Sequence, residues 1–174
     1  GLIWEEAARG GIRFVVGSSG VEHALTAHWR NIGLLPPDCR PPSSPGAADR
    51  LLVVSGSCSP VTESQIRHAL AHGFAGIRAD PVRMLDDGDA EAHHAELLAE
   101  AEAVLRAGGS PLIYTAAGPD DPAIEAVRRR LERHGTAPFD TARRIGERLG
   151  RLVRDLVGEH RHARFAVAGG DTSG

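Results

Sequence analysis

Five short apolar runs along the chain lack regular polar alternation, which is typical of strands buried on both faces of a parallel sheet. The runs cover residues 13–16, 51–54, 75–78, 112–114 and 165–168. Between them lie apolar residues at helical spacing, in one stripe through residues 97–105 and another through residues 145–157. Gly108 follows the first stripe and is a typical C-terminal stop. Strand and helix therefore alternate along the chain.

The segment after the fourth run carries the signals of a further helix. Asp120 or Asp121 is predicted to cap its start, with Pro122 in the first turn, and Gly135 is predicted to end it. Its inward-facing residues are expected to be Ile124, Val127 and Leu131. The alternation predicts an α/β fold, a three-layer α/β/α arrangement with a mostly parallel open sheet and right-handed crossovers.

The stretch of residues 33–49 contains five prolines and is expected to be an extended connection over the surface. We expect residues 1–174 to form one domain that continues at both ends. The first residues are helix-like with nothing before them, and the last strand runs into Ala-Gly-Gly-Asp-Thr-Ser-Gly where a helix is due.

Composition narrows the classes of function. The formal net charge is −3 and no apolar run approaches the 18 or so residues of a membrane span, which argues against nucleic-acid and membrane partners. The N-terminus lacks the pattern of a secretory signal, and two cysteines, Cys39 and Cys58, make no disulfide framework. A reducing cytoplasm is therefore expected.

All 20 basic residues are arginine, because the chain contains no lysine. This excludes Schiff-base chemistry, pyridoxal phosphate anchoring and the lysine-dependent phosphate loop. The absence of lysine therefore excludes these lysine-dependent mechanisms but does not indicate which mechanism the protein uses.

Three loops that follow strands combine glycines and hydroxyl side chains. They are residues 17–20 (Gly-Ser-Ser-Gly), residues 55–60 (Ser-Gly-Ser-Cys-Ser-Pro) and residues 169–174 (Gly-Gly-Asp-Thr-Ser-Gly). Ligands of open α/β sheets bind beyond the carboxyl ends of the strands, and a helix N-terminus with hydroxyls suits a phosphate. Each loop alone is more often ordinary capping, with Ser19 and Ser59 as caps, but three loops on one edge favour a phosphate-binding site.

Other candidates are weaker. The serine loops lack the glycine spacing of a hydrolase nucleophile elbow. His68 and His72 have metal-ligand spacing but no carboxylate between them, which favours an exposed helix face. Cys58 is interpreted as a small buried residue and the arginines at 128–130 as a solvated face.

Taken in order, several strings resemble a known family. They are VVGSSGVEHAL, LLVVSGSCSPVTESQI, IRADP, LIYTAAGPDD and FAVAGGDTSG, and they cover nearly the whole chain. They are similar to the C-terminal nucleotide-binding domain of the four-carbon acid sugar kinases. The resemblance implies ATP-dependent phosphorylation of threonate, erythronate or 3-oxo-tetronate, with the sugar acid bound mainly by a preceding N-terminal domain.

The same resemblance implies the site residues. Ser57 or Ser59 would contact ATP, and the loop formed by Gly169, Gly170, Asp171, Thr172, Ser173 and Gly174 would face the phosphates. Arginines, helix N-termini and Mg²⁺ can neutralise charge in phosphoryl transfer without lysine. Asp171 is the motif-borne candidate for a catalytic base, although the preceding domain is an alternative source. No protein ligand to a metal is assigned.

Two other hypotheses about the function stay open. A phosphosugar-binding, isomerase-like module also uses serine-rich loops after parallel strands, but has no use for Gly-Gly-Asp-Thr after the last strand. A catalytically silent interaction domain is the second. The choice of sugar acid and the oligomeric state, a homo-oligomer included, are not determined by the sequence.

Overall fold

The computed structural model describes residues 19–36, 46–135, 137–159 and 164–169. The chain divides into two compact units, residues 1–46 and residues 47–174. In the first unit, helix α2 (Ser19–Asn31) begins at Ser19, the residue predicted to cap it, and is followed by a turn that includes Gly33 at φ 75°. The expected strand at residues 13–16 lies outside the described residues, as does most of the proline-rich connection.

The second unit is built on a parallel sheet of four strands in the order β2-β3-β1-β4. Its strands are β1 (Leu51–Ser55), β2 (Ala75–Arg78), β3 (Pro111–Tyr114) and β4 (Arg164–Ala168). In the register, Val54 of β1 lies opposite Ile113 of β3 on one side and Val167 of β4 on the other. Four of the five predicted strands are thereby confirmed to within one residue at each end.

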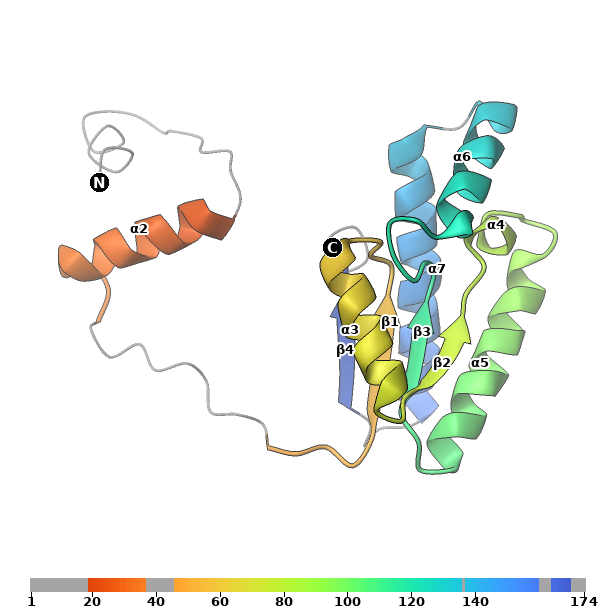
Figure 1. The fold of residues 1–174 in the computed structure, drawn as a ribbon, viewed down its shortest axis with the longest axis horizontal. Coiled ribbons are helices and arrows are strands. Elements are labelled where there is room, and N and C mark those ends of the chain that lie inside the picture. Colours follow the sequence, from red (N-terminus) through yellow and green to blue (C-terminus); the bar gives the residue numbers. More distant parts are fainter. Residues whose placement is uncertain (1–18, 37–45, 136, 160–163, 170–174) are drawn as a thin grey trace. The chain divides into compact units, whose positions relative to one another are not determined.

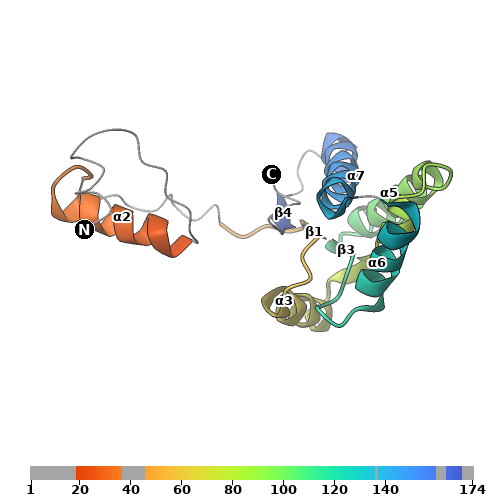
Figure 2. The ribbon, with the colours of Figure 1, turned by 90° about the horizontal axis from the view of Figure 1, so that it is seen from above.

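Helices cover both faces of this sheet, which confirms the predicted three-layer α/β fold (Figure 1 and Figure 2). Helix α3 (Pro60–Ala71) lies on one face, and helices α5 (Ala90–Arg106) and α7 (Pro138–Glu159) lie on the other. The short helix α4 (Pro81–Met84) and helix α6 (Pro122–His134) stand near the end of the sheet to which the strands point. None of the described helices is long and apolar enough to cross a lipid bilayer.

The core lies between the sheet and the pair α5 and α7. Side chains of alternate strand residues point to this face, among them Leu52, Val54 and Ile113. The predicted apolar stripes of α5 and α7 pack against these strand side chains. The residues of the two stripes that are at most 3% exposed are Leu97, Ala101, Leu105, Leu149, Leu152 and Leu156. Close packing of branched apolar side chains therefore fixes α5 and α7 on the sheet.

Ion pairs also link α5 to α7. Arg148 and Arg151 donate to Glu91 Oε1 at 2.5 and 2.7 Å, and both arginines lower the pKa of Glu91. The Glu91 side chain is 60% exposed, and exposed pairs contribute on the order of 0–1 kcal/mol. The apolar contacts, not these pairs, hold the two helices in place.

We predict that Leu152→Ala lowers the free energy of unfolding by about 2–5 kcal/mol, because it leaves a cavity in a fully packed core. Leu34→Ala is the control, since Leu34 is 58% exposed, and its expected effect is within about 0.5 kcal/mol. Urea unfolding followed by circular dichroism measures both. Equal effects of the two substitutions would contradict this assignment of the core.

Candidate functional site

Backbone hydrogen bonds bring the loops after β1, β3 and β4 together at the carboxyl ends of the strands. The Thr115 amide donates to Ser55 O at 3.1 Å, and the Gly56 amide donates to Ala168 O at 3.0 Å. The loop after β1 therefore lies between the other two. This confirms that two of the predicted strand-end loops, those beginning at Ser55 and Gly169, start side by side.

Three hydroxyls gather where this loop enters α3. Ser57 Oγ lies 2.8 Å and Ser59 Oγ lies 3.0 Å from Thr62 Oγ1. Ser59 caps the helix as predicted, because its Oγ accepts from the Thr62 amide at 3.2 Å and Pro60 occupies the first turn. Ser57 Oγ in turn accepts from the Ser59 amide at 3.3 Å. The loop is thus held in one conformation by its own side chains.

The same helix start leaves donors available. Within the described part of the chain, the amides of Cys58 and Val61 donate to no protein acceptor. The first amides of a helix carry partial positive charge and point out of its N-terminus. Together with the hydroxyls, they form a surface able to accept an anion such as a phosphate group.

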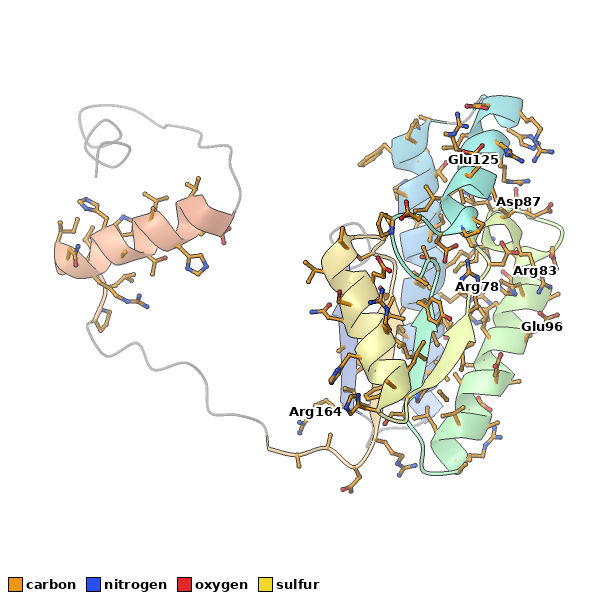
Figure 3. The ribbon with its side chains drawn as sticks, viewed as in Figure 1. Arg78, Arg83, Asp87, Glu96, Glu125 and Arg164 are labelled. Carbon is orange, nitrogen blue, oxygen red and sulfur yellow. The ribbon has the colours of Figure 1, made fainter. Side chains whose placement is uncertain are left out.

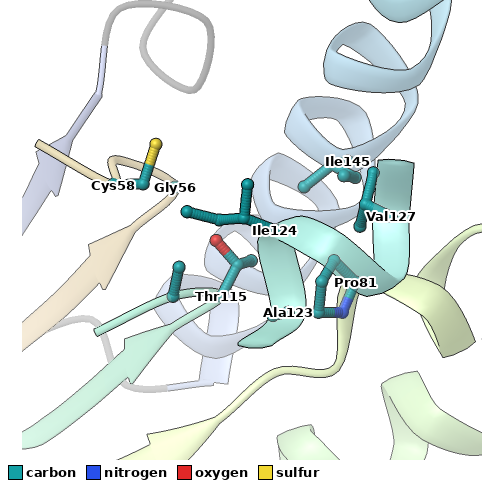
Figure 4. A pocket seen from close by; sticks show the side chains of 9 residues that line it. Gly56, Cys58, Pro81, Thr115, Ala123, Ile124, Val127 and Ile145 are labelled. Atoms are coloured by element: carbon teal, nitrogen blue, oxygen red, sulfur yellow. The ribbon is translucent and has the colours of Figure 1, made fainter. Parts of the chain in front are cut away.

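An apolar pocket of about 170 Å³ adjoins this loop (Figure 4). Gly56 and Cys58 of the loop after β1 form one wall, and Thr115 begins the loop after β3 at its base. The remaining lining residues come from the start of α4 and from the loop after β3, α6 and α7: Pro81, Ala116, Ala123, Ile124, Val127 and Ile145. The pocket therefore combines elements that lie far apart in sequence.

Asp121 anchors the loop between β3 and α6. Its Oδ2 accepts from the Ala117 amide at 2.7 Å, and its Oδ1 accepts from the Ala123 amide at 2.9 Å and from Arg78 at the end of β2 (Figure 3). The Asp121 side chain is only 4% exposed. Arg78 and these amides hold the pKa of Asp121 at about 2. The carboxylate thus joins β2, β3 and α6 next to the pocket.

Helix α4 is fixed by a separate polar network. Asp80 caps it, and the Asp80 amide donates to His93 Nε2 of α5 at 2.9 Å. Arg83 donates to Asp89 Oδ2 at 2.6 Å and to Glu96 Oε2 at 2.6 Å, two groups that raise its pKa (Figure 3). Arg83 is therefore committed to protein carboxylates. Arg78 is paired with Asp121 as well, although its side chain is 45% exposed at the sheet edge.

The predicted site residues divide into two groups. The structure places Ser57 and Ser59 at the start of α3 and Gly169 directly after β4, at φ 131°. Gly170, Asp171, Thr172, Ser173 and Gly174 lie outside the described residues, as do Gly17 and Ser18. The roles assigned to these residues stay predictions.

Two interpretations of single side chains are wrong. Cys58 is exposed rather than buried, because it lies in the loop after β1, beyond the end of the sheet and its core. Ile124 is 37% exposed and lines the pocket rather than packing inward, because α6 stands beyond the end of the sheet. His68 lies in the last turn of α3 and His72 caps its C-terminus, with the two rings stacked at 3.9 Å between centroids. No group of three metal-binding side chains occurs in the described ranges.

Sequence reasoning missed Thr115, Arg78 and the anchoring contacts of Asp121. Thr115 is followed by small residues directly after a strand, which is the signal that marked the other loops. The pairing of Arg78 with Asp121 joins positions 43 residues apart and leaves no local pattern in the sequence.

The comparisons with known proteins decide the family. A family model described as "Nucleotide-binding C-terminal domain" matches residues 52–174, from β1 to the end of the chain. The chain belongs to this family. The match covers the second unit and includes every residue that lines the pocket.

Curated relatives share both this region and the first unit. The chain is 42% identical to a 3-oxo-isoapionate kinase of Paraburkholderia graminis over 99% of the chain and 36% of that protein. It is 29% identical to a 3-oxo-tetronate kinase of Pectobacterium atrosepticum over 99% of the chain and 38% of that protein. The chain thus spans a little over a third of the length of these relatives.

A solved structure shares the fold. It is a domain of unknown function from Bordetella bronchiseptica, described as a domain-swapped dimer with bound citrate. The TM-score is 0.51 at 25% identity, over 74% of this chain and 27% of that one. The parallel sheet and its helices are therefore a fold that this chain shares with that structure.

We predict that Asp121→Asn lowers the free energy of unfolding at pH 7 by about 1–2 kcal/mol. Asparagine has one acceptor oxygen, which can still cap α6 from the Oδ1 position, but it loses the negative charge that faces Arg78 and leaves the Ala117 amide without its acceptor. The folded-state pKa of Asp121, about 2, is below its ordinary value of 3.8. The Asp121 carboxylate therefore makes its full contribution to the free energy of unfolding above its ordinary pKa. This contribution is lost as the pH falls through the folded-state pKa.

Urea unfolding at pH 7 and at steps down to about pH 2.5 tests this linkage, and the difference in the free energy of unfolding between wild type and variant should narrow as the pH falls below about 4. Asp140→Asn serves as the control, because the Asp140 side chain is 55% exposed and its pair with Arg143 spans 4.0 Å. A gap for Asp121→Asn that stays constant with pH would contradict the ion-pair assignment.

Proposed function

We propose that the chain is the nucleotide-binding part of an ATP-dependent kinase that phosphorylates a four-carbon sugar acid of the 3-oxo-tetronate type. The observation that carries the proposal is the serine-capped N-terminus of α3, which lies beside the end of β4 and an apolar pocket. The relatives named 3-oxo-tetronate kinase and 3-oxo-isoapionate kinase support the reaction class. A sugar-acid site in a preceding domain is part of this proposal.

The described residues fit the phosphate end of a nucleotide. The Cys58 and Val61 amides and the Ser57 hydroxyl would receive phosphate oxygens at the start of α3. The exposed part of the Arg78 guanidinium, which is also paired with Asp121, would offer further N–H donors at the edge of the sheet. ATP, when bound, supplies the phosphoryl group. Phosphoryl transfer has a loose transition state, so positioning and charge neutralisation are the main tasks of these residues.

Mg²⁺ fits this arrangement through the phosphates. The described residues offer no group of three metal-binding side chains, but Mg²⁺ is usually held by substrate phosphates, water and only one or two carboxylates. We propose Asp171 as that carboxylate or as the base that takes the proton of the sugar-acid hydroxyl. Gly169, Gly170, Thr172, Ser173 and Gly174 would let the phosphates approach closely.

Two further parts of the proposal concern the whole protein. A homo-oligomer is supported by the Bordetella bronchiseptica relative, which is described as a domain-swapped dimer. We propose a cytoplasmic location as well, since that is where ATP, the substrate proposed above, is available.

A phosphosugar-binding module is the second candidate, because the cluster of Ser57, Ser59 and Thr62 hydroxyls at a helix start suits any phosphate ester. The apolar pocket favours the nucleotide reading, since a sugar phosphate has no apolar ring to fill it. A catalytically silent interaction domain would bind neither ligand.

We predict that ATP·Mg and ADP·Mg stabilise the protein against thermal unfolding, whereas sugar phosphates do not. Ligand at about 100 times its Kd adds about 2.7 kcal/mol to the stability of the folded state. Ser57→Ala should weaken this effect, whereas Ser64→Ala should not, because Ser64 is an exposed serine of α3 whose hydroxyl donates to Pro60 O.

Stabilisation by sugar phosphates with no response to millimolar nucleotide would favour the phosphosugar module. A lack of response to both ligand classes would favour the interaction domain. Phosphorylation assays of the intact protein with 3-oxo-tetronate and 3-oxo-isoapionate would then identify the acid, and activity on neither would refute the kinase assignment.

For Asp171 we predict that Asp171→Asn lowers kcat of the intact protein by about 100-fold or more and leaves its melting temperature nearly unchanged. If the carboxylate only capped a following helix, asparagine would preserve both activity and stability to within about 1 kcal/mol. Asp140→Asn, at an exposed position of α7, is the control for the same chemical change. An active, stable Asp171→Asn variant would remove Asp171 from the chemistry.

A further inference from the structure

The pocket between α6 and the loop after β1 contains one polar side chain without a partner. Thr115 is 6% exposed, and among the described residues its hydroxyl makes no hydrogen bond, although its amide donates to Ser55 O. Figure 4 shows the hydroxyl pointing into the space bordered by Cys58 and Ile124. The Thr115 oxygen is not among the fully buried side-chain polar atoms that lack a hydrogen bond in the described residues, so it is open to the pocket. A hydroxyl that opens into an apolar pocket and makes no bond to the protein is a candidate ligand contact.

The size and lining of the pocket limit what it holds. Pockets for whole drug-sized ligands measure about 300–1,000 Å³, so a space of about 170 Å³ accepts only part of a nucleotide. Its walls are the side chains of Ile124, Val127 and Ile145 with the flat surface of Pro81, which offer nothing to a charged or hydroxyl-rich group. A flat heterocycle matches this lining.

The position of the pocket agrees with that assignment. Gly56 and Cys58 line it, and the same loop continues into the hydroxyls and free amides at the start of α3. A nucleotide with its phosphates at the start of α3 therefore has its base within reach of the pocket. Ile124, a large apolar residue that is 37% exposed, would be covered by that base.

We propose that the pocket holds the heterocyclic base of the nucleotide and that the Thr115 hydroxyl hydrogen-bonds the polar edge of that base. This inference rests on the proposed nucleotide-binding function. Thr115 is then the residue that orients the base, because a hydroxyl both donates and accepts and the rest of the pocket is apolar. Asp121 positions this wall indirectly, through its bonds to the Ala117 and Ala123 amides.

Binding of ATP and of inorganic tripolyphosphate, which has no base, to the intact protein tests the inference by calorimetry. Thr115→Val should weaken ATP binding by about three- to tenfold and leave tripolyphosphate binding unchanged, since it removes one hydrogen bond and preserves shape. Thr115→Ser keeps the hydroxyl and should stay within about twofold of wild type. Ala123→Leu, which fills the pocket from α6, should weaken ATP binding by more than about tenfold with the same tripolyphosphate affinity.

Thr141→Val is the matched control, because Thr141 is 3% exposed but lies outside this pocket, and it should bind ATP as the wild type does. Melting temperatures confirm that each variant folds. Unchanged ATP affinity in Thr115→Val, or equal loss of ATP and tripolyphosphate, would overturn the inference. A wild-type protein that binds no ATP would instead refute the proposed function itself.

Discussion

The hydrogen bonding of β1 to a parallel strand on each side is the constraint on which the rest of the second unit depends. With β3 on one side and β4 on the other, β1 has both faces and both edges covered, and its residues are apolar as far as Val54. Its last residue, Ser55, is buried, and its hydroxyl accepts from the Ser57 amide. The last carbonyl of β1 and the next amide still belong to the ladder, through Thr115 and Ala168. Backbone groups become available to a ligand only after Gly56, where the ladder ends. A binding site can therefore form only beyond the carboxyl end of β1.

Local signals in the sequence were sufficient for the elements. Apolar runs without alternation identified β1 to β4, and leucine spacing identified the buried faces of α5 and α7. Ser59 was recognised as a cap, and the cap of α6 was limited to Asp120 or Asp121, of which the structure selects Asp121. Such caps can be predicted because the capping oxygen and the amide it accepts from are two or three residues apart. Each of these signals depends on residues that are close in sequence, or on the regular spacing of apolar residues along one helix or strand.

The candidate site was predictable only in part, for a physical reason. The rule that loops at the carboxyl ends of strands bind ligands located Ser57 and Ser59 correctly. The pocket, however, is formed by side chains from the loops after β1 and β3 and from α4, α6 and α7. Whether Ile124 faces the core or the pocket depends on where α6 stands relative to the sheet, which helical periodicity alone does not specify.

Because the chain has arginine and no lysine, its arginine–carboxylate ion pairs respond to pH in one direction only. A guanidinium stays protonated at every pH a protein meets, so the partners of Asp121 and Glu91 never lose their charge in alkaline solution. These pairs fail only from the acid side, when a carboxylate takes up a proton. The chain also has no lysine, so side-chain acetylation cannot remove any of its positive charges.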